Sequence, residues 1–214
     1  MGLASMVAQP STLFDKTSRW FERAQAALLN DLPCRRGCSH CCLGLFPITV
    51  LDRQELQRGL RSLSEKHRRA IEDTAALQVR MIEESAPELS RNRFIDHWPD
   101  SDVDFIVERY RSLPCPALSS DGSCGLYAFR PLTCRSMGIP SETEGNVQGA
   151  CAVQTSVPLI RLSRSLRQEE DRLAEEETRQ LMYLQHQNVA TGEELLLPYA
   201  FLPDFTEESA GATA

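Results

Sequence analysis

The chain has 214 residues, a net charge of −7 at pH 7 and a charged fraction of 25%. This length suits one domain with its own hydrophobic core. The acidic balance argues against general nucleic-acid binding, which needs a basic face. The longest apolar stretch, residues 43–51, is too short to cross a bilayer, and the N-terminus lacks the features of a signal peptide. We therefore expect a cytoplasmic protein with neither a nucleic-acid nor a membrane partner.

The sequence contains no internal repeat and no alternation of strand and helix patterns. We expect a flexible N-terminus at residues 1–11, a single metal-binding domain at 12–205 and a disordered tail at 206–214. The tail is short and consists mostly of small and polar residues, which is typical of a free chain end.

Three helices are predicted in the first half of the chain. The first covers residues 12–30 and leads into a cysteine cluster. The second begins at Asp52, which lies three residues before Glu55 in the spacing of a capping box. The third covers residues 62–84. The core stripe predicted for this third helix consists of Ala70, Ile71, Thr74, Leu77, Met81 and Ile82.

The second half of the chain holds a long stretch of weak periodicity. A short helix is predicted at 102–112, with Phe105, Ile106 and Tyr110 turned inward. Residues 113–157 are rich in loops, and a bound metal can fix such a stretch. A long helix is expected from Pro158 to about residue 187, and the apolar segment 194–203 should pack on the core. The fold class is therefore mainly α: helices around a loop-rich cysteine metal-binding layer, with little or no sheet.

The chemistry-bearing feature is CRRGCSHCC, which places four thiols within residues 34–42. The other four cysteines lie within residues 115–151. Thiols remain reduced in the cytoplasm, so eight cysteines there indicate a metal site more than disulfides. Cys38-x-x-Cys41 has the spacing of a metal knuckle, and thiolates suit zinc or iron–sulfur clusters. The alternative is that some of these residues are buried free thiols, since cysteine packs well in cores.

Cys41 and Cys42 are adjacent, and adjacent side chains of an extended segment point to opposite sides. They are therefore not expected to bind one isolated ion together. Their adjacency favours a polynuclear cluster, two neighbouring sites, or one spare thiol. Arginines beside the cysteines are candidates to offset thiolate charge or to donate hydrogen bonds to sulfur, although they also fit an ordinary surface role. We expect a [4Fe–4S] cluster, with zinc as the alternative.

The pieces GCSHCC, DGSCGLY and RPLTCR together resemble the CxxCxxCC family of cysteine-cluster proteins, described as zinc- or iron-chelating. The resemblance runs from Cys34 to Cys151. It implies that Arg130 and Arg135, in the RPLTCR motif, belong to the cofactor site. It also implies that all eight cysteines are metal ligands: Cys34, Cys38, Cys41, Cys42, Cys115, Cys124, Cys134 and Cys151.

Two classes of function follow from the residues and from this resemblance. In the first, the protein binds a metal ion or cluster, and also another protein, with no assignable reaction. In the second, it is an iron–sulfur-dependent, S-adenosylmethionine-using protein lysine methyltransferase, because flagellin lysine-N-methylase contains the same domain. The chain is short for the extra regions of that enzyme. The spacing Cys34-x-x-x-Cys38-x-x-Cys41 also occurs in radical S-adenosylmethionine enzymes, but their β/α barrel requires a strand–helix alternation that is missing here. Whether the protein is an enzyme stays open.

Overall fold

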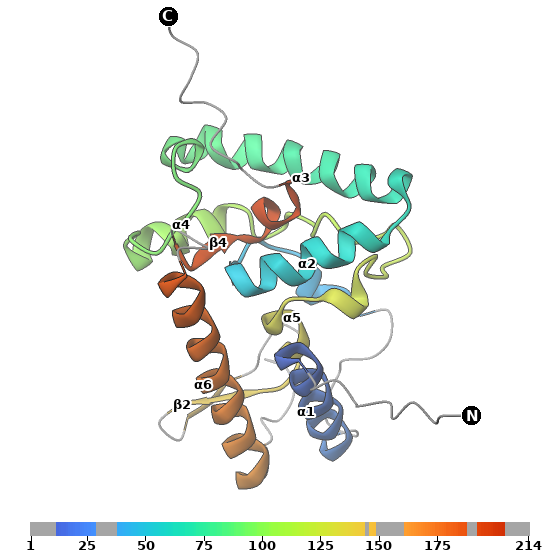
Figure 1. Ribbon diagram of the computed structural model, residues 1–214, viewed down its shortest axis with the longest axis vertical. Helices are drawn as coiled ribbons and strands as arrows, with labels where there is room; N and C mark the ends of the chain where they lie inside the picture. The colour runs from blue at the N-terminus through green and yellow to red at the C-terminus, as the bar shows by residue number, and fades with distance from the viewer. Residues whose placement is uncertain (1–11, 29–37, 144–145, 149–160, 188–191, 204–214) are drawn as a thin grey trace, which may run out of the picture. The chain divides into compact units, whose positions relative to one another are not determined.

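A computed structural model describes residues 12–28, 38–143, 146–148, 161–187 and 192–203 (Figure 1). Within these residues there are six α-helices and two small two-stranded sheets, so the mainly α prediction is confirmed. The chain forms two compact units. Unit 1 contains residues up to Pro33 together with Arg135–Gln180, and unit 2 contains Cys34–Cys134 together with the chain from Leu181. The division into a flexible N-terminus, one domain and a tail stays a prediction, and residues 1–11 and 206–214 lie outside the described ranges.

Unit 1 is built from two helices and a small sheet. Helix α1 (Leu13–Ala27) begins at a capping box, in which the Thr12 hydroxyl accepts from the Asp15 amide and the Asp15 carboxylate accepts from the Thr12 amide. These hydrogen bonds lower the pKa of Asp15. Strands β2 (Ser141–Thr143) and β3 (Asn146–Gln148) pair antiparallel. The buried core of the unit consists of Trp20, Ala24, Leu28, Ile139 and Leu162.

Helix α6 (Arg164–His186) begins later than the sequence predicted. Residues 161–163 are described and are not helical, and the Ser163 hydroxyl accepts a hydrogen bond from the Leu166 amide at 3.4 Å. The expected start at Pro158 is therefore wrong, because Ser163 caps the helix and its first residue is Arg164. Pro158 itself lies outside the described residues.

In unit 2, the other elements pack around the apolar segment at residues 194–203. Strand β1 (Pro47–Thr49) pairs antiparallel with β4 (Glu194–Leu196), with Ile48 opposite Leu195. The following turn, Leu197–Phe201, is completely buried and packs against α2 (Val50–Ser62) and α3 (Glu65–Ser85). The Gln57 amide donates to the carbonyls of Ala200 and Leu202 at 2.7 and 2.9 Å. The prediction that residues 194–203 return to the core is confirmed.

Two helix starts differ from the sequence analysis because a nearby residue makes the better cap. Thr49, rather than Asp52, caps α2, and Asp52 occupies the third helical position of that capping box. Ser64, rather than Ser62, caps α3. The spacing that defines a capping box is satisfied by Thr49 with Asp52 and also by Asp52 with Glu55, so spacing alone does not choose between them.

The predicted core stripe of α3 is only partly inside. The buried residues of this helix are Ile71, Ala75, Gln78, Val79 and Ile82. Leu77 and Met81 are instead 56% and 46% exposed. Helix α4 (Asp100–Arg109) buries Ile106 as predicted, but Phe105 is 63% exposed. The Tyr110 hydroxyl, one residue after α4, donates to the Met81 carbonyl and so joins the ends of the two helices.

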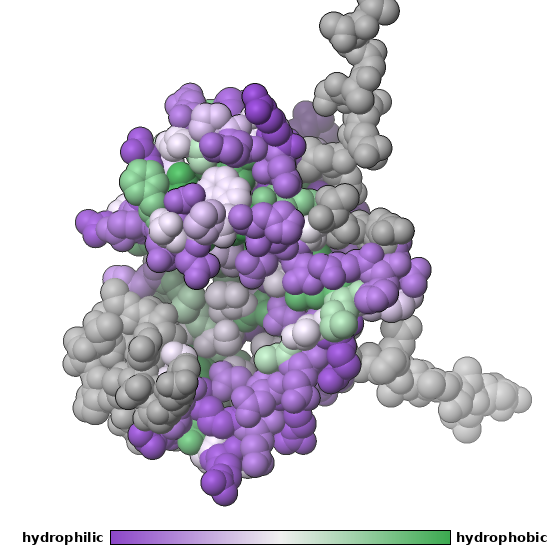
Figure 2. All heavy atoms as spheres, turned by 90° about the vertical axis from the view of Figure 1, so that its left-hand side faces the viewer, coloured by the Kyte–Doolittle hydropathy of each residue, from purple (hydrophilic) through white to green (hydrophobic). Residues whose placement is uncertain are grey.

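The visible surface is mostly hydrophilic (Figure 2). On the face seen in Figure 2, hydrophilic residues predominate and apolar residues form small separate patches. Among the described residues, the helices are all too short or too polar to cross a membrane.

Gly59 in α2 allows a close approach by Phe129. A Cβ atom at this position would lie 2.6 Å from Cγ of Phe129. In an open helix, Gly59→Ala would stabilise by about 1 kcal/mol, but overpacking costs about 1–3 kcal/mol. We expect a net loss of up to about 2 kcal/mol in the free energy of unfolding, measured by urea denaturation. Arg61→Ala, at an exposed site of the same helix, should change it by less than about 0.5 kcal/mol. An increase in stability for Gly59→Ala would contradict the observed packing.

Candidate metal centre

The first cysteine segment ends in a single 3-10 turn, His40–Cys42. The turn places the side chains of Cys41 and Cys42 in hydrogen-bond contact, with the Cys42 thiol as donor. This contact lowers the pKa of Cys41 and raises that of Cys42, and burial raises the latter further. Cys38 is described and partly exposed, whereas Cys34 lies outside the described residues. Because the backbone curls here, Cys41 and Cys42 are neighbours and do not point to opposite sides as an extended segment would require.

Backbone hydrogen bonds join this turn to the second cysteine segment. The Cys115 amide donates to the Cys42 carbonyl at 2.7 Å, and the Gly44 amide donates to the Leu113 carbonyl at 2.8 Å. Gly44 has a φ of +103°, and a Cβ on it would lie 3.2 Å from the Arg111 carbonyl oxygen. The two cysteine-bearing segments, more than 70 residues apart in sequence, therefore lie side by side.

A tight hairpin brings Cys115 and Cys124 together. Leu118 forms an isolated antiparallel bridge with Cys124, and the Gly125 amide donates to the Ala117 carbonyl at 2.8 Å. The turn is closed by the Asp121 carboxylate, which accepts from the Ser123 amide at 2.9 Å. This arrangement is an Asx turn, in which a side chain replaces a backbone acceptor.

Backbone amides of this hairpin point at its sulfur atoms. Burial raises the pKa of Cys115 to about 12, while hydrogen bonds from the amides of Ala117 and Leu118 act in the opposite direction. Burial also raises the pKa of Cys124, and the Leu126 amide opposes that rise. Amides aimed at sulfur stabilise a thiolate, which is the form that binds metal.

The buried carboxylate of Asp52 positions the helix that carries Cys134. Cys134 lies on α5 (Leu132–Ser136), and the Asp52 carboxylate accepts from the Leu132 amide at 2.7 Å. The same carboxylate accepts from the Thr49 amide at 3.3 Å, and Asp52 is only 1% exposed. One acidic side chain therefore caps both α2 and α5. The pKa of Cys134 is well above its usual value, mainly because of burial, with contributions from nearby thiols and Asp52.

Five thiols of unit 2 thus lie close enough to influence each other electrostatically. Soft thiol donors of this kind and number fit zinc or an iron–sulfur cluster. In the described part of the chain, however, no group of three or more His, Cys, Asp or Glu side chains is already arranged around one point. The six described cysteines are all unpaired by disulfides. The five neighbouring thiols are Cys41, Cys42, Cys115, Cys124 and Cys134.

The two predicted cofactor-binding arginines have different surroundings. The Arg130 guanidinium lies 3.7 Å from the centroid of the Tyr127 ring, and its Nε donates to the Tyr127 carbonyl. Its positive charge acts to lower the pKa of both Cys41 and Cys124, so it lies near enough to influence these thiols electrostatically. Arg58 and Gly59 of α2 contact Phe129 and thereby support the turn that precedes Arg130.

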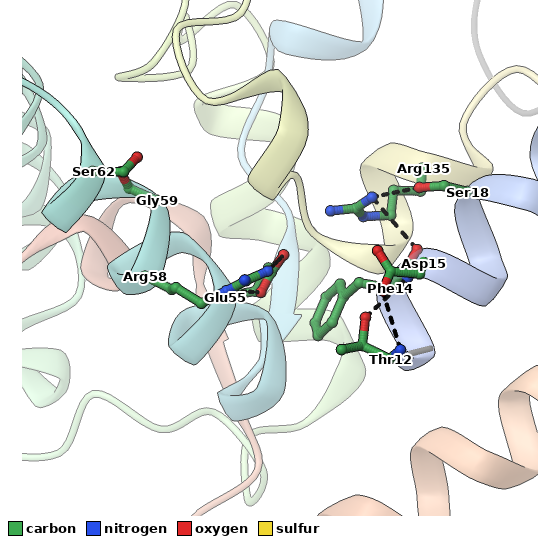
Figure 3. Close-up of polar contacts among 9 residues, drawn as sticks. All are labelled: Thr12, Phe14, Asp15, Ser18, Glu55, Arg58, Gly59, Ser62 and Arg135. Atoms are coloured by element: carbon green, nitrogen blue, oxygen red, sulfur yellow. Dashed lines mark hydrogen bonds and ion pairs between the residues drawn. The ribbon is translucent and has the colours of Figure 1, made fainter. Parts of the chain in front are cut away.

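Arg135 belongs to unit 1 and contacts helix α1 (Figure 3). Its guanidinium donates to the Ser18 hydroxyl and to the Phe14 carbonyl, and lies 5.3 Å from the centroid of the Phe14 ring. It is 5% exposed. These contacts give Arg135 a structural role in its own unit, and its role at the cofactor stays a prediction.

The structure therefore brings together five of the eight predicted ligands. Cys34 and Cys151 lie outside the described residues, and the ligand role of each cysteine stays a prediction. Sequence analysis treated Asp52 only as a helix cap and missed its bond to α5. A signal was present, because Leu132 begins a helix directly after Pro131 with no serine, threonine, asparagine or aspartate in the cap position.

Replacing Asp52 should loosen α5 and the thiol that it carries. Asp52→Ala leaves the Leu132 amide without its acceptor and removes one half of the α2 capping box, which together cost about 2–4 kcal/mol. Thr49→Ala is the matched control, because it weakens only the α2 cap and should cost about 1 kcal/mol. Denaturant unfolding measures both values, and amide exchange at residues 132–136 should rise only for Asp52→Ala. Equal effects of the two substitutions would contradict the bridging role.

Comparison with known proteins bears on the same segment of the chain. A family model described as "CxxCxxCC: Putative zinc- or iron-chelating domain" matches residues 33–152, which is over half of the chain. The searches of curated proteins and of solved structures found no match. The matched range includes all eight cysteines and the backbone hydrogen bond that joins Cys115 to Cys42. The chain belongs to the CxxCxxCC family, and metal chelation is the property for which that family is described.

Proposed function

We propose that this protein binds a [4Fe–4S] cluster through cysteine thiolates of unit 2 and acts as a metal-binding protein without turnover. The observation that carries the proposal is the set of backbone amides directed at the sulfur atoms of Cys115 and Cys124. Hydrogen bonds to cysteine sulfur stabilise the ionised ligand and set the reduction potential of iron–sulfur clusters. The ligands proposed are the family cysteines: Cys34, Cys38, Cys41, Cys42, Cys115, Cys124, Cys134 and Cys151.

The number of converging thiols favours a cluster over one zinc ion. A structural zinc site is closed by four ligands in a tetrahedron, whereas five thiols already lie near one another among the described residues. Cys41 and Cys42 are in contact, and two thiolates so close are stabilised better by several metal centres than by a single ion. Two adjacent zinc sites remain the alternative arrangement of eight cysteines.

The residues around the thiols supply charge balance and exclusion of water. The Arg130 guanidinium, held against Tyr127, lies near the excess negative charge of a tetrathiolate cluster. The partial burial of Cys115 and Cys134 restricts the access of solvent to their thiols. A bound [4Fe–4S] cluster would supply one-electron chemistry, and the protein residues would tune its potential through these hydrogen bonds and this charge.

Metal analysis tests the proposal directly. We expect protein purified without oxygen to be brown, with broad visible absorption and matching amounts of iron and acid-labile sulfide. Cys115→Ser should lose most of the iron, whereas Ser112→Ala, an exposed site in the same segment, should retain it. A colourless protein with stoichiometric zinc would replace the cluster with structural zinc. Protein with neither metal after anaerobic purification would contradict the ligand assignment as a whole.

The charge of Arg130 should affect the reduction potential. Reduction adds an electron, and a nearby cation stabilises the added charge, so Arg130→Gln should make the potential more negative by roughly tens of millivolts. Arg109→Gln is a matched control, because Arg109 also lies over a tyrosine ring, 5.9 Å from the centroid of Tyr110. Spectroelectrochemical titration measures both variants. An unchanged potential in Arg130→Gln, with iron content intact, would exclude the electrostatic role.

A further inference from the structure

Helix α3 carries a second apolar stripe that the described residues of its unit leave exposed. Four residues without charge recur at intervals of four, three and four positions, which places them along one side of a helix. Leu77 and Met81 are 56% and 46% exposed, and the other two are also exposed. Single exposed apolar residues are ordinary, but a row with helical spacing is typical of a contact surface. The stripe consists of Ala70, Thr74, Leu77 and Met81.

The opposite side of α3 packs into the core of unit 2. Ile71, Ala75 and Ile82 are buried, and the Gln78 amide donates to the Pro114 carbonyl at 2.8 Å. The helix is therefore held in place by its inner side alone. The Thr74 hydroxyl donates to the Ala70 carbonyl at 2.8 Å, so covering the stripe would leave this group with its acceptor.

We propose that the stripe is the interface of a homodimer in which α3 packs antiparallel against α3 of a second copy. A twofold axis between Thr74 and Leu77 brings Leu77 of one copy against Thr74 of the other. The same axis brings Met81 against Ala70. Each large side chain then meets a small one, which lets two helices pack closely over the length of the stripe.

Charges beside the stripe select this orientation. Asp73 and Arg80 are both exposed, lie seven residues apart and border the same side of the stripe. In the antiparallel pair, Asp73 of each copy faces Arg80 of the other, so two ion pairs form across the axis. A parallel pair would place Asp73 and Arg80 on opposite sides of the contact and seven residues apart, so neither pair would form. Flanking charges of this kind set the partner and the orientation of paired helices.

Among the described residues, other charges of α3 pair within the chain, but Asp73 and Arg80 do not. On α3, Arg69 pairs with Glu65, and Arg68 pairs with Glu72 at 3.7 Å. In the portion of the protein for which side chains are described, neither Asp73 nor Arg80 belongs to an ion pair. The charge pattern is therefore complementary to itself only when two copies meet.

The contact is one helix pair, which is small for a permanent dimer. We therefore expect a reversible dimer whose population depends on protein concentration. Sedimentation equilibrium of the full chain with its metal, from micromolar to millimolar concentration, should show dissociation within that range.

Charge exchange tests both the interface and its orientation. Asp73→Arg places two arginines opposite each other, and Arg80→Asp places two aspartates opposite each other, so each variant alone should weaken dimerisation at least tenfold. The double variant D73R/R80D restores opposite charges and should recover the dimer. An equimolar mixture of the two single variants should form heterodimers, detectable by native mass spectrometry, because every facing pair is then opposite in sign.

Folding controls keep the result interpretable. Both positions are on the exposed side of α3, so circular dichroism and metal content should match the parent protein. Leu77→Glu should also abolish dimerisation, whereas Glu88→Gln, exposed and outside α3, should leave it unchanged. A parent protein that stays monomeric at millimolar concentration would overturn the proposal. The stripe would then be a candidate contact surface for a different protein. A dimer that persists in both single variants would place the interface elsewhere.

Discussion

The Asp52 carboxylate is the interaction on which the arrangement of unit 2 depends most. It is almost fully buried and accepts hydrogen bonds at the start of α2 and at the start of α5. A buried carboxylate is unfavourable unless hydrogen-bond donors compensate for the lost water, and helix N-termini provide such donors. The side chain therefore couples the two helices. The free-energy cost of burying its charge is offset only when both helix N-termini are in place to donate hydrogen bonds. Because α5 carries Cys134, the same contact connects the helical framework to the thiol layer.

The thiol layer is held by backbone contacts rather than by side-chain packing. The amide of Cys115 binds the carbonyl of Cys42, and the hairpin that follows aims further amides at sulfur. Such contacts do not depend on the identity of the intervening side chains, which suits a loop-rich segment with little periodicity. The pKa shifts of Cys42, Cys115 and Cys134 record the consequence, since crowding and burial disfavour several thiolates without a compensating cation. A bound metal would supply that compensation.

Sequence reasoning succeeded where a local signal had a single interpretation. The mainly α class, the Thr12 start of α1 and the return of residues 194–203 to the core all follow from periodicity and helix caps. It failed where two solutions satisfied one pattern. Asp52 fits both the first and the fourth position of a capping box, and α3 has apolar residues on two sides. Periodicity reveals that a stripe exists, but only the neighbouring elements determine which stripe is buried.

The sequence named the candidate ligands of the site but did not predict how they are arranged. The spacing of the cysteines indicated metal, and the family assignment agrees with that prediction. The proximity of Cys42 to Cys115 depends on a main-chain hydrogen bond between distant segments, which leaves no trace in residue type. The different surroundings of Arg130 and Arg135 could not be predicted from the sequence either. Both belong to one motif, yet one lies near thiols and the other contacts α1.

The late position of the Leu197–Phe201 turn has a consequence for synthesis of the protein. Helices α2 and α3 are completed early, but their shared core is filled by residues that are translated much later. At about 5–20 residues per second, several seconds separate the appearance of Cys134 from that of Phe201. During this interval the thiols are attached to a nascent chain whose core is still open. The thiols are therefore most exposed to oxidants and to competing metals during synthesis. The correct metal has to be delivered within this short interval.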